Sequence, residues 1–289
     1  MNRLPLANGD VPIKPEEFRL FRDLVSARTG LALAGDARLG MGRKLRERLV
    51  VLNITTFAEY YQYLRFSPLA PAEWDGLVEL FTTNETYFFR EDFQLRAFRD
   101  ELLPVFAERG KSKRRLSVWS AGCATGEEAY TIAILVHESG LFDGWEVRVF
   151  GSDISKRCVT AARRGVYGAP SFRVMSVDMR RQHFIERADG AHVADRIRAM
   201  CHFGQLNLLD EEKARILGRV DAIFCRNVLI YFDTQARRRV IDNFHDRLYP
   251  GGVLLLGHSE SLLNVSTAFE LLHLKEDLVY KKPLAQPML

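Results

Sequence analysis

The spacing of apolar residues divides the chain into two parts with different predicted secondary structure. Over most of residues 1–81 the apolar positions recur at helical spacing, as in the stripe that contains Met41, Leu45 and Leu49. Beyond Gly110, short apolar runs typical of strands alternate with helical stretches, which is the pattern of a parallel α/β sheet. The pattern therefore predicts an all-α N-terminal domain followed by an α/β domain.

Strand-like runs recur through the second part of the chain. They cover, in order, residues 117–120, 147–152, 202–206, 221–225, 252–257 and 278–280. Residues 82–98 are expected to form a linker between the domains, and residues 99–289 the α/β domain. Residues 180–203 within it have an irregular pattern with an Asp189-Gly190 turn signal, which predicts a small inserted antiparallel β-subdomain.

Composition places the chain among soluble globular proteins. A length of 289 residues suits two domains, and 47% of the residues are hydrophobic and 27% charged. No apolar run approaches membrane-spanning length, and the N-terminus has no signal-peptide pattern. The four cysteines are scattered without metal-ligand spacing. We therefore expect a cytoplasmic monomer with reduced thiols, no metal site and no membrane insertion. The net charge of +4 is too small to identify a partner.

A glycine-containing loop offers the first candidate chemistry. Residues 116–131 read L-S-V-W-S-A-G-C-A-T-G-E-E-A-Y-T, a strand followed by a small-residue loop with Gly122 and then a helix. This is the entry to a Rossmann-like unit. Glu127 and Glu128 in the first helical turn exclude a pyrophosphate site, whereas they suit a positively charged nucleoside such as S-adenosylmethionine. A plain β–α turn without a ligand remains the alternative.

The next predicted strand ends in an acid. Asp153 follows residues 147–152, and an acid at the tip of the second strand of a doubly wound sheet faces the ribose of a bound nucleoside. Its alternative role is to cap the helix that begins near Ser155. Both roles are compatible.

The predicted helix over residues 38–52 carries a concentration of positive charge. Four basic residues lie off its leucine stripe, with Glu47 the one acid among them: Arg43, Lys44, Arg46 and Arg48. Such a face is either an ordinary solvated surface or a docking surface for an acidic partner.

Four segments and a short motif together resemble a known family. The segments are residues 82–91 (T-T-N-E-T-Y-F-F-R-E), 118–130 (V-W-S-A-G-C-A-T-G-E-E-A-Y), 150–154 (F-G-S-D-I) and 221–233 (D-A-I-F-C-R-N-V-L-I-Y-F-D), and the motif is G-H-S-E at 257–260. In this order they resemble the chemotaxis receptor methyltransferases of the CheR family. The family architecture has the same parts as the one that periodicity predicts: a helical domain, a linker and a Rossmann-like methyltransferase domain with an inserted β-subdomain.

The resemblance implies an activity and a set of site residues. S-adenosylmethionine would be the cofactor, with S-adenosylhomocysteine as product. Glutamate side chains on the cytoplasmic helices of chemoreceptors would accept the methyl group, and no nucleic acid would bind. Besides Gly122 of the loop, the family's cofactor contacts fall on Asn84, Thr86, Arg90, Glu128, Asp153, Asn207, Leu208, Arg226 and Asn227. Arg90 and Tyr231 take the positions nearest the reacting centre. The basic helix would recognise the receptor.

Two other functions are compatible with a cofactor loop of this kind. One is a nucleic-acid methyltransferase whose basic N-terminal domain would bind phosphates. Against it, the chain has no Asn/Asp-Pro-Pro-Tyr/Phe motif for amino-group methylation and no catalytic cysteine that follows a proline. The other is a non-catalytic module that binds the cofactor. Some CheR proteins also hold a C-terminal receptor pentapeptide on the β-subdomain. Here the hairpin is compact and carries Arg187, Asp189 and Asp195, so we predict that it does not bind this tether.

Overall fold

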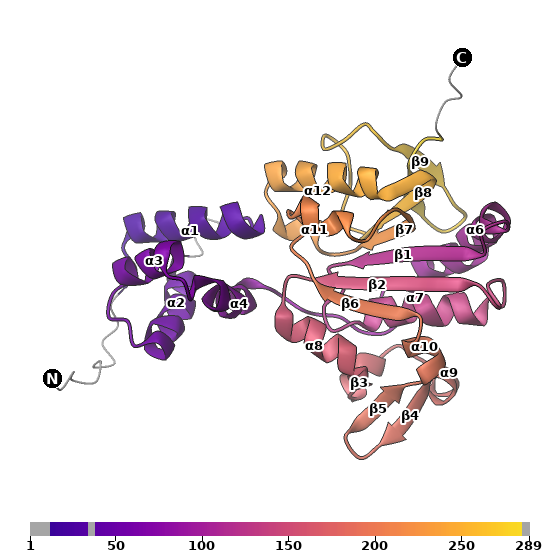
Figure 1. The fold of residues 1–289 in the computed structure, drawn as a ribbon, viewed down its shortest axis with the longest axis horizontal. Coiled ribbons are helices and arrows are strands. Elements are labelled where there is room, and N and C mark those ends of the chain that lie inside the picture. Colours follow the sequence, from indigo (N-terminus) through magenta and orange to yellow (C-terminus); the bar gives the residue numbers. More distant parts are fainter. Residues whose placement is uncertain (1–11, 34–37, 285–289) are drawn as a thin grey trace. The chain divides into compact units, whose positions relative to one another are not determined.

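The computed structural model describes residues 12–33 and 38–284, and the chain divides into two compact units, residues 1–82 and 83–289 (Figure 1). The first unit is helical in its described residues. It contains α1 (Pro15–Thr29), α2 (Arg38–Leu52), α3 (Phe57–Phe66) and α4 (Ala70–Phe81). Local signals set the bounds: Thr56 caps α3 by accepting a hydrogen bond from the Glu59 N–H, and Gly30 ends α1 with a φ of 78°. The predicted all-α domain is confirmed.

A buried ion pair joins three helices of the first unit. Arg48 of α2 donates to both carboxylate oxygens of Glu73 on α4, at 2.9 and 2.7 Å, and only 3% of the Glu73 side chain is exposed. The hydroxyl of Tyr60 on α3 donates to the same carboxylate. Burial, followed by the hydrogen bond to Glu73, raises the pKa of Tyr60 far above its usual value. Arg48 therefore has an internal partner that its position on the basic helix did not reveal.

The second unit is built on a mixed seven-stranded sheet. Its strands are β1 (Arg115–Ala121), β2 (Glu146–Asp153), β6 (Cys201–Gln205), β7 (Val220–Cys225), β8 (Leu248–Leu256), β9 (Glu270–His273) and β10 (Leu278–Lys281). The order is β6-β2-β1-β7-β8-β10-β9. The first five strands in this order are parallel, and β10 and β9 are antiparallel additions. The Rossmann-like α/β prediction is confirmed.

Helices cover both faces of this sheet (Figure 1). The helices and helical turns of this unit are α5 (Asp92–Ala97), the π-helical turn η2 (Phe98–Leu102), α6 (Leu103–Gly110), α7 (Glu127–Glu138), α8 (Lys156–Arg164), η3 (Ala169–Phe172), α9 (Val177–His183), α10 (Asp195–Arg198), α11 (Glu211–Arg215), η4 (Leu229–Tyr231) and α12 (Thr234–Arg247). Neighbouring residues of β1 face opposite sides, since Val118 joins the core under α7 and Trp119 packs on Phe244 of α12.

The inserted β-subdomain has three short strands rather than one hairpin. They are β3 (Val166–Tyr167), β4 (Phe184–Arg187) and β5 (Gly190–Val193), in the order β3-β5-β4. The predicted bounds of 180–203 miss β3 and include part of β6, which belongs to the main sheet. A strand of two residues is too short to show an alternating pattern, so periodicity cannot reveal β3.

No helix within residues 12–33 and 38–284 is long and apolar enough to cross a membrane. Nor does any group of three or more His, Cys, Asp or Glu in these ranges form an arrangement that could hold a metal ion. All four cysteines are free thiols.

Candidate functional site

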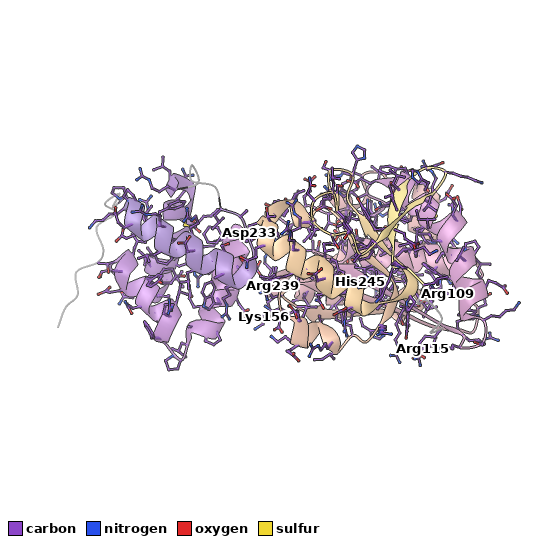
Figure 2. The ribbon with its side chains drawn as sticks, turned by 90° about the horizontal axis from the view of Figure 1, so that it is seen from above. Arg109, Arg115, Lys156, Asp233, Arg239 and His245 are labelled. Carbon is purple, nitrogen blue, oxygen red and sulfur yellow. The ribbon has the colours of Figure 1, made fainter. Side chains whose placement is uncertain are left out.

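The predicted site residues of the second unit gather at the carboxyl ends of adjacent parallel strands. The strands β6, β2, β1 and β7 lie side by side in the sheet. Asp153 is the last residue of β2, whereas Asn207, Gly122 and Arg226 lie in the loops that follow β6, β1 and β7, respectively. Ligands of open α/β sheets bind at this edge. Figure 2 shows two helices that begin here, with Lys156 at the start of α8 and Asp233 at the start of α12.

Asp153 fastens the glycine loop to the end of β2. One of its carboxylate oxygens accepts a hydrogen bond from the Ala124 N–H and the other from the Ser155 N–H, both at 2.9 Å. Two further loop amides, those of Gly122 and Cys123, donate to the Ser152 carbonyl at 2.8 and 2.9 Å. The N-cap of α8 is Ser155 and not Asp153. Asp153 therefore shapes the loop as well as standing at the predicted ribose position.

The glycines of the loop are required by packing between protein segments. Gly122 has a φ of 82°, and a Cβ there would lie 2.5 Å from Cγ2 of Val228. Gly126 has a φ of 98°, and its Cβ would lie 2.8 Å from that of Ala162. The loop is thus pressed against the segment after β7 on one side and against α8 on the other. This close packing is a reason for glycine that does not involve a ligand.

The two glutamates that open α7 have different surroundings. Glu127 is 3% exposed, and its carboxylate accepts hydrogen bonds from the Thr125 and Ser171 hydroxyls at 2.7 and 2.9 Å. Glu128 accepts one from Ser120 at 2.7 Å and lies 3.4 Å from Arg226. Burial raises the pKa of both carboxyls, and for Glu128 the charge of Arg226 opposes this shift only in part. Of the two, Glu128 is the one that joins the network of the site.

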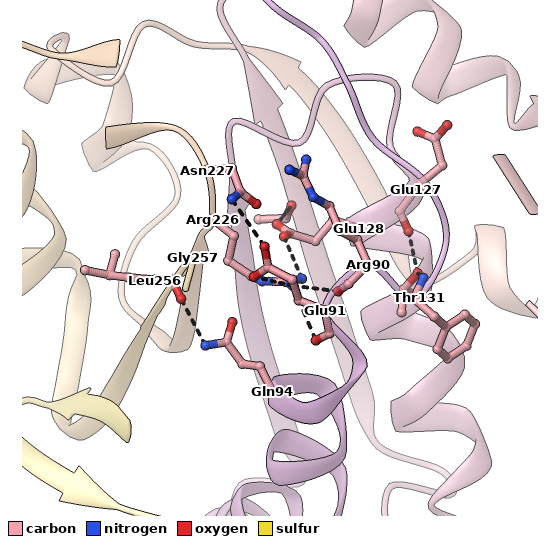
Figure 3. A network of polar contacts seen from close by, with 12 residues as sticks. Arg90, Glu91, Gln94, Glu127, Glu128, Thr131, Arg226, Asn227, Leu256 and Gly257 are labelled. Atoms are coloured by element: carbon pink, nitrogen blue, oxygen red, sulfur yellow. Dashed lines mark hydrogen bonds and ion pairs between the residues drawn. The ribbon is translucent and has the colours of Figure 1, made fainter. Parts of the chain in front are cut away.

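Arg226 is the centre of a buried polar network (Figure 3). Its side chain is 2% exposed, and Nη2 donates to the Arg90 carbonyl at 2.6 Å and lies 3.2 Å from the Glu91 carboxylate. Nη1 lies 3.4 Å from the Glu128 carboxylate. A single guanidinium therefore joins the end of β7 to the linker and to the first turn of α7.

The linker has a strained backbone on both sides of Arg90. Phe89 and Glu91 have positive φ angles of 60° and 52°, a conformation that costs a non-glycine residue about 1–2 kcal/mol. Three contacts hold it: the Phe89 N–H donates to the Thr131 hydroxyl at 3.2 Å, the Phe88 N–H donates to the Ser171 carbonyl at 2.9 Å, and Arg226 binds the Arg90 carbonyl. The direction in which the Arg90 side chain leaves the backbone is therefore fixed.

The guanidinium of Arg90 is held more lightly than its backbone. Nη1 donates to the Glu85 carbonyl at 2.8 Å, and the guanidinium lies 5.9 Å from the centre of the Tyr87 ring. Arg173 binds the Glu85 carboxylate at 2.8 Å and stacks 3.6 Å above the same ring. Arg90 makes no ion pair with the adjacent Glu91 or Asp92 among the contacts of the described residues. These acids instead pair with Arg226 and Arg96, respectively.

The remaining predicted residues are placed as follows. Tyr231 ends the short turn η4 after β7 and is 37% exposed. Asn84 and Thr86 are half-buried in the linker. The side-chain carbonyl of Asn207 accepts the Leu209 N–H at 3.1 Å, whereas Leu208 packs in the core under α12.

Two acids that sequence reasoning did not assign are central to the site. Glu91 binds Arg226 and accepts from the Asn227 side-chain amide at 3.3 Å. Burial raises the pKa of Glu91, but the charge of Arg226 and hydrogen bonds from Asn227 and His258 together bring it below its usual value. Glu260 binds backbone N–H groups of the segment after β7. Both acids stand inside the motifs quoted above, which was the available signal.

One buried polar atom of this site suits a nucleoside cofactor. Two cations, Arg226 and Arg90, act on the Glu128 carboxylate, so charge alone does not select a cationic ligand. Oδ1 of Asn227 is buried with no hydrogen-bond partner in the described part of the chain. Such an acceptor suits an ammonium or hydroxyl donor of a ligand. Asn227 and Glu128 stay predicted contacts of S-adenosylmethionine.

Comparison with known families identifies the chain. Residues 84–278 match the family model described as CheR methyltransferase, SAM binding domain, and residues 16–82 match CheR methyltransferase, all-alpha domain. The chain belongs to the CheR methyltransferase family. The predicted S-adenosylmethionine cofactor and the predicted methyltransferase activity in chemotaxis are confirmed.

Similar proteins match this CheR chain over most of its length. Chemotaxis protein methyltransferase 2 of Vibrio cholerae is 33% identical, and the match covers 95% of this chain and 96% of the relative. Chemotaxis protein methyltransferase 2 of Pseudomonas aeruginosa is 36% identical over 87% of this chain and 88% of the relative. The Salmonella typhimurium chemotaxis protein methyltransferase is 34% identical over 88% and 86%.

Replacing Asp153 tests its double role in the cofactor site. We expect Asp153→Ala to weaken S-adenosylmethionine binding about 10- to 100-fold, because a hydrogen bond to a charged group contributes about 1.5–3 kcal/mol. The midpoint of thermal unfolding should also fall, since the Ala124 and Ser155 amides lose their acceptor. Calorimetric titration and thermal melts measure the two effects. Ser176→Ala removes the cap of α9 and serves as control, with lower stability and unchanged affinity. Unchanged affinity in Asp153→Ala would refute the ribose role.

Proposed function

We propose that this chain transfers the methyl group of S-adenosylmethionine to glutamate side chains on the cytoplasmic helices of chemoreceptors, forming glutamate methyl esters. We further propose that it acts in the cytoplasm as a monomer and binds no nucleic acid. The observation that carries the proposal is the match of both family domains in order, with relatives named chemotaxis protein methyltransferase over almost the full length. Arg90 and Tyr231 are the residues proposed to meet the acceptor carboxylate.

A glutamate acceptor makes few chemical demands on the protein. Its carboxylate is already ionised near neutral pH, so no general base is needed. The cofactor, when bound, supplies a methyl group activated by the positive charge of its sulfonium. The contribution of the protein is then in-line alignment of the reacting groups, which can lower the barrier by several kcal/mol. No histidine or thiol has to act as a base.

Arg90 is proposed to align the incoming carboxylate. A guanidinium binds a carboxylate through two parallel hydrogen bonds. The guanidinium of Arg90 donates to the Glu85 carbonyl and lies beside the Tyr87 ring. Negative charge disappears from the carboxylate as the methyl group moves. Tight binding of the carboxylate would therefore stabilise the ground state more than the transition state. Arg90 should act through geometry more than through charge.

Tyr231 is proposed as the second group at the reacting centre. It lies at the end of η4, with 37% of its surface exposed. Its phenol can donate one hydrogen bond to the carboxylate oxygen that does not accept the methyl group.

The transfer assay tests the activity and the role of Arg90 together. Radiolabelled S-adenosylmethionine is incubated with receptor-rich membranes or with RNA. We expect base-labile label on the receptor, because a methyl ester is hydrolysed by alkali. Arg90→Lys keeps the positive charge but loses the planar guanidinium. Its kcat should therefore be about 100-fold or more below that of wild type, close to the kcat of Arg90→Ala. A Lys variant with nearly full activity would refute alignment by the fork.

The same assay separates the alternative functions. Stable label on RNA would support a nucleic-acid methyltransferase, and cofactor binding without transfer would support a non-catalytic module. Some nucleic-acid methyltransferases use a cysteine thiolate as nucleophile. Burial raises the pKa of the Cys123, Cys201 and Cys225 thiols, which argues against that role for them here. These thiols stay protonated and inert at neutral pH.

The basic face of α2 is proposed to recognise the acidic receptor. Arg43 is exposed, Lys44 lies 5.3 Å from the Phe81 ring, and Arg46 donates to the Gly42 carbonyl at 3.2 Å. Arg48 differs from these three because its guanidinium binds the buried Glu73 carboxylate. Complementary charge contributes mainly to association and specificity. Arg43, which is exposed, is thus better placed to meet a partner than Arg48.

Charge reversal on α2 should affect the receptor and not the cofactor. We expect the double variant Arg43→Glu and Arg46→Glu to raise KM for the receptor about 10-fold or more at low salt, with less effect at high salt. S-adenosylmethionine affinity should be unchanged. The matched control reverses Arg19 and Arg22 of α1, which changes the net charge by the same amount. If both double variants raised KM for the receptor equally, the effect would reflect net charge and not recognition by α2.

The β-subdomain is proposed not to bind a receptor pentapeptide. Its edge strand β4 has four residues, and Glu186 on this strand is engaged by Arg180 at 2.7 Å. The turn is closed by an Asp189–His192 contact at 2.8 Å. Peptide addition to a sheet needs a free edge and pockets for alternate side chains. A short edge with engaged charges is poorly suited to it.

Fluorescence anisotropy with a labelled receptor pentapeptide tests this prediction. We expect no saturable binding up to about millimolar concentration, the range in which non-specific contacts dominate. Receptors with and without the C-terminal pentapeptide should be methylated with the same KM. Saturable micromolar binding that Glu186→Pro abolishes would overturn the prediction and place the peptide on β4.

A further inference from the structure

Glu260 binds an unusual number of backbone amides beside the site. One carboxylate oxygen accepts hydrogen bonds from the N–H groups of Gly257 and Asn227, both at 2.8 Å. The other accepts from those of Val228 and Ile230, at 2.9 and 3.2 Å. One side chain thus satisfies four donors, three of them in the segment that follows β7.

A carboxylate is the side chain that this arrangement requires. An ionised carboxylate accepts only and has about four lone-pair positions, one for each donor here. Hydrogen bonds to a charged acceptor are also stronger than neutral ones. A glutamine would present an NH₂ group to two of the four N–H donors, whichever way its amide is turned. The site therefore distinguishes Glu from its closest isostere.

Close packing shows that the segment after β7 is wedged in place. A Cβ on Gly257 would lie 2.7 Å from the Asn227 nitrogen and 2.8 Å from the Glu260 carboxylate. On the other side, Val228 is so close to Gly122 that a Cβ there would be 2.5 Å from it. Glu260 therefore holds the segment against the glycine loop of the cofactor site.

The amides that Glu260 binds control the orientation of two site residues. Asn227 has a positive φ of 58°, and its side-chain amide donates to Glu91 at 3.3 Å. Tyr231 closes the turn η4 by donating its N–H to the Val228 carbonyl at 3.1 Å. Fixing Val228 and Ile230 thus fixes the turn that presents the phenol.

We propose that Glu260 is a positioning residue for methyl transfer. It touches none of the reacting groups and acts by holding residues 227–231, so that Asn227 faces the cofactor and Tyr231 faces the acceptor carboxylate. The inference rests on the proposed function, because Tyr231 has a role only if a carboxylate is methylated beside it. Glu260 is the one member of the G-H-S-E motif with this contact pattern.

Steady-state kinetics of two Glu260 variants test the proposal. We expect Glu260→Gln to lower kcat about 10- to 100-fold at saturating cofactor and receptor, the size of effect that a misplaced active-site group produces. KM for the receptor should change much less, because α2 is untouched. Glu260→Asp keeps the charge but is one methylene shorter, so its kcat should fall between those of Gln and wild type. Glu270→Gln, on the exposed edge strand β9, is the matched control and should retain wild-type kcat.

Two further measurements separate positioning from general stability. Hydrogen exchange should speed up at the amides of residues 227–230 in Glu260→Gln while the helices of the same unit keep wild-type protection. In a double-mutant cycle, Glu260→Gln should lower kcat much less in a Tyr231→Phe background than in wild type, because both changes act through the same phenol.

Three outcomes would overturn the proposal. The first is a folded Glu260 variant with faster exchange at 227–230 and wild-type kcat. The second is that Glu260→Gln lowers kcat by the same factor in the Tyr231→Phe background as in wild type. The third is that neither the Gln nor the Asp variant folds, which would make Glu260 a residue of stability alone. Wild-type protein that labels no receptor would instead refute the proposed function, so the two failures are distinguishable.

Discussion

The buried guanidinium of Arg226 is the interaction on which the candidate site depends. A charge with 2% exposure is strongly destabilising unless ion pairs and hydrogen bonds compensate for the lost water. Here the compensation comes from the Arg90 carbonyl and from the carboxylates of Glu91 and Glu128. Because these partners belong to the linker and to α7, satisfying the charge also assembles the site.

The same constraint explains why a strained linker persists. Left-handed backbone at Phe89 and Glu91 survives only where surrounding contacts over-determine it. Backbone bonds to Thr131, Ser171 and Arg226 do so, while the Arg90 guanidinium itself donates to the Glu85 carbonyl. Alignment of a carboxylate needs a guanidinium that is free to bind it and a backbone that is rigid. The opposite edge of the site follows the same logic, since Glu260 fixes backbone while Tyr231 remains exposed at 37%.

Predictions made from short stretches of sequence succeeded for features that depend on adjacent residues alone. The small-residue loop and the acid ending β2 lie at the expected edge of the sheet. Local pattern treats Glu127 and Glu128 alike, and the family resemblance alone singled out Glu128; which of them joins the Arg226 network depends on the surrounding fold, because successive helical residues point about 100° apart. Arg48 resembled its neighbours on α2, and its difference depends on Glu73, which lies 25 residues away on another helix.

The sequence by itself determined the kinds of element, their order, the two-domain plan and the strand ends at which the site forms. Periodicity, helix caps and glycine turns act over a few residues, so they can be seen along the chain. Only the tertiary structure decided which charges pair, such as Arg226 with Glu91 across 135 residues and Glu260 with the Asn227 amide across 33. These pairings follow from burial, since a charge removed from water must bind whatever partners the folded loops bring to it.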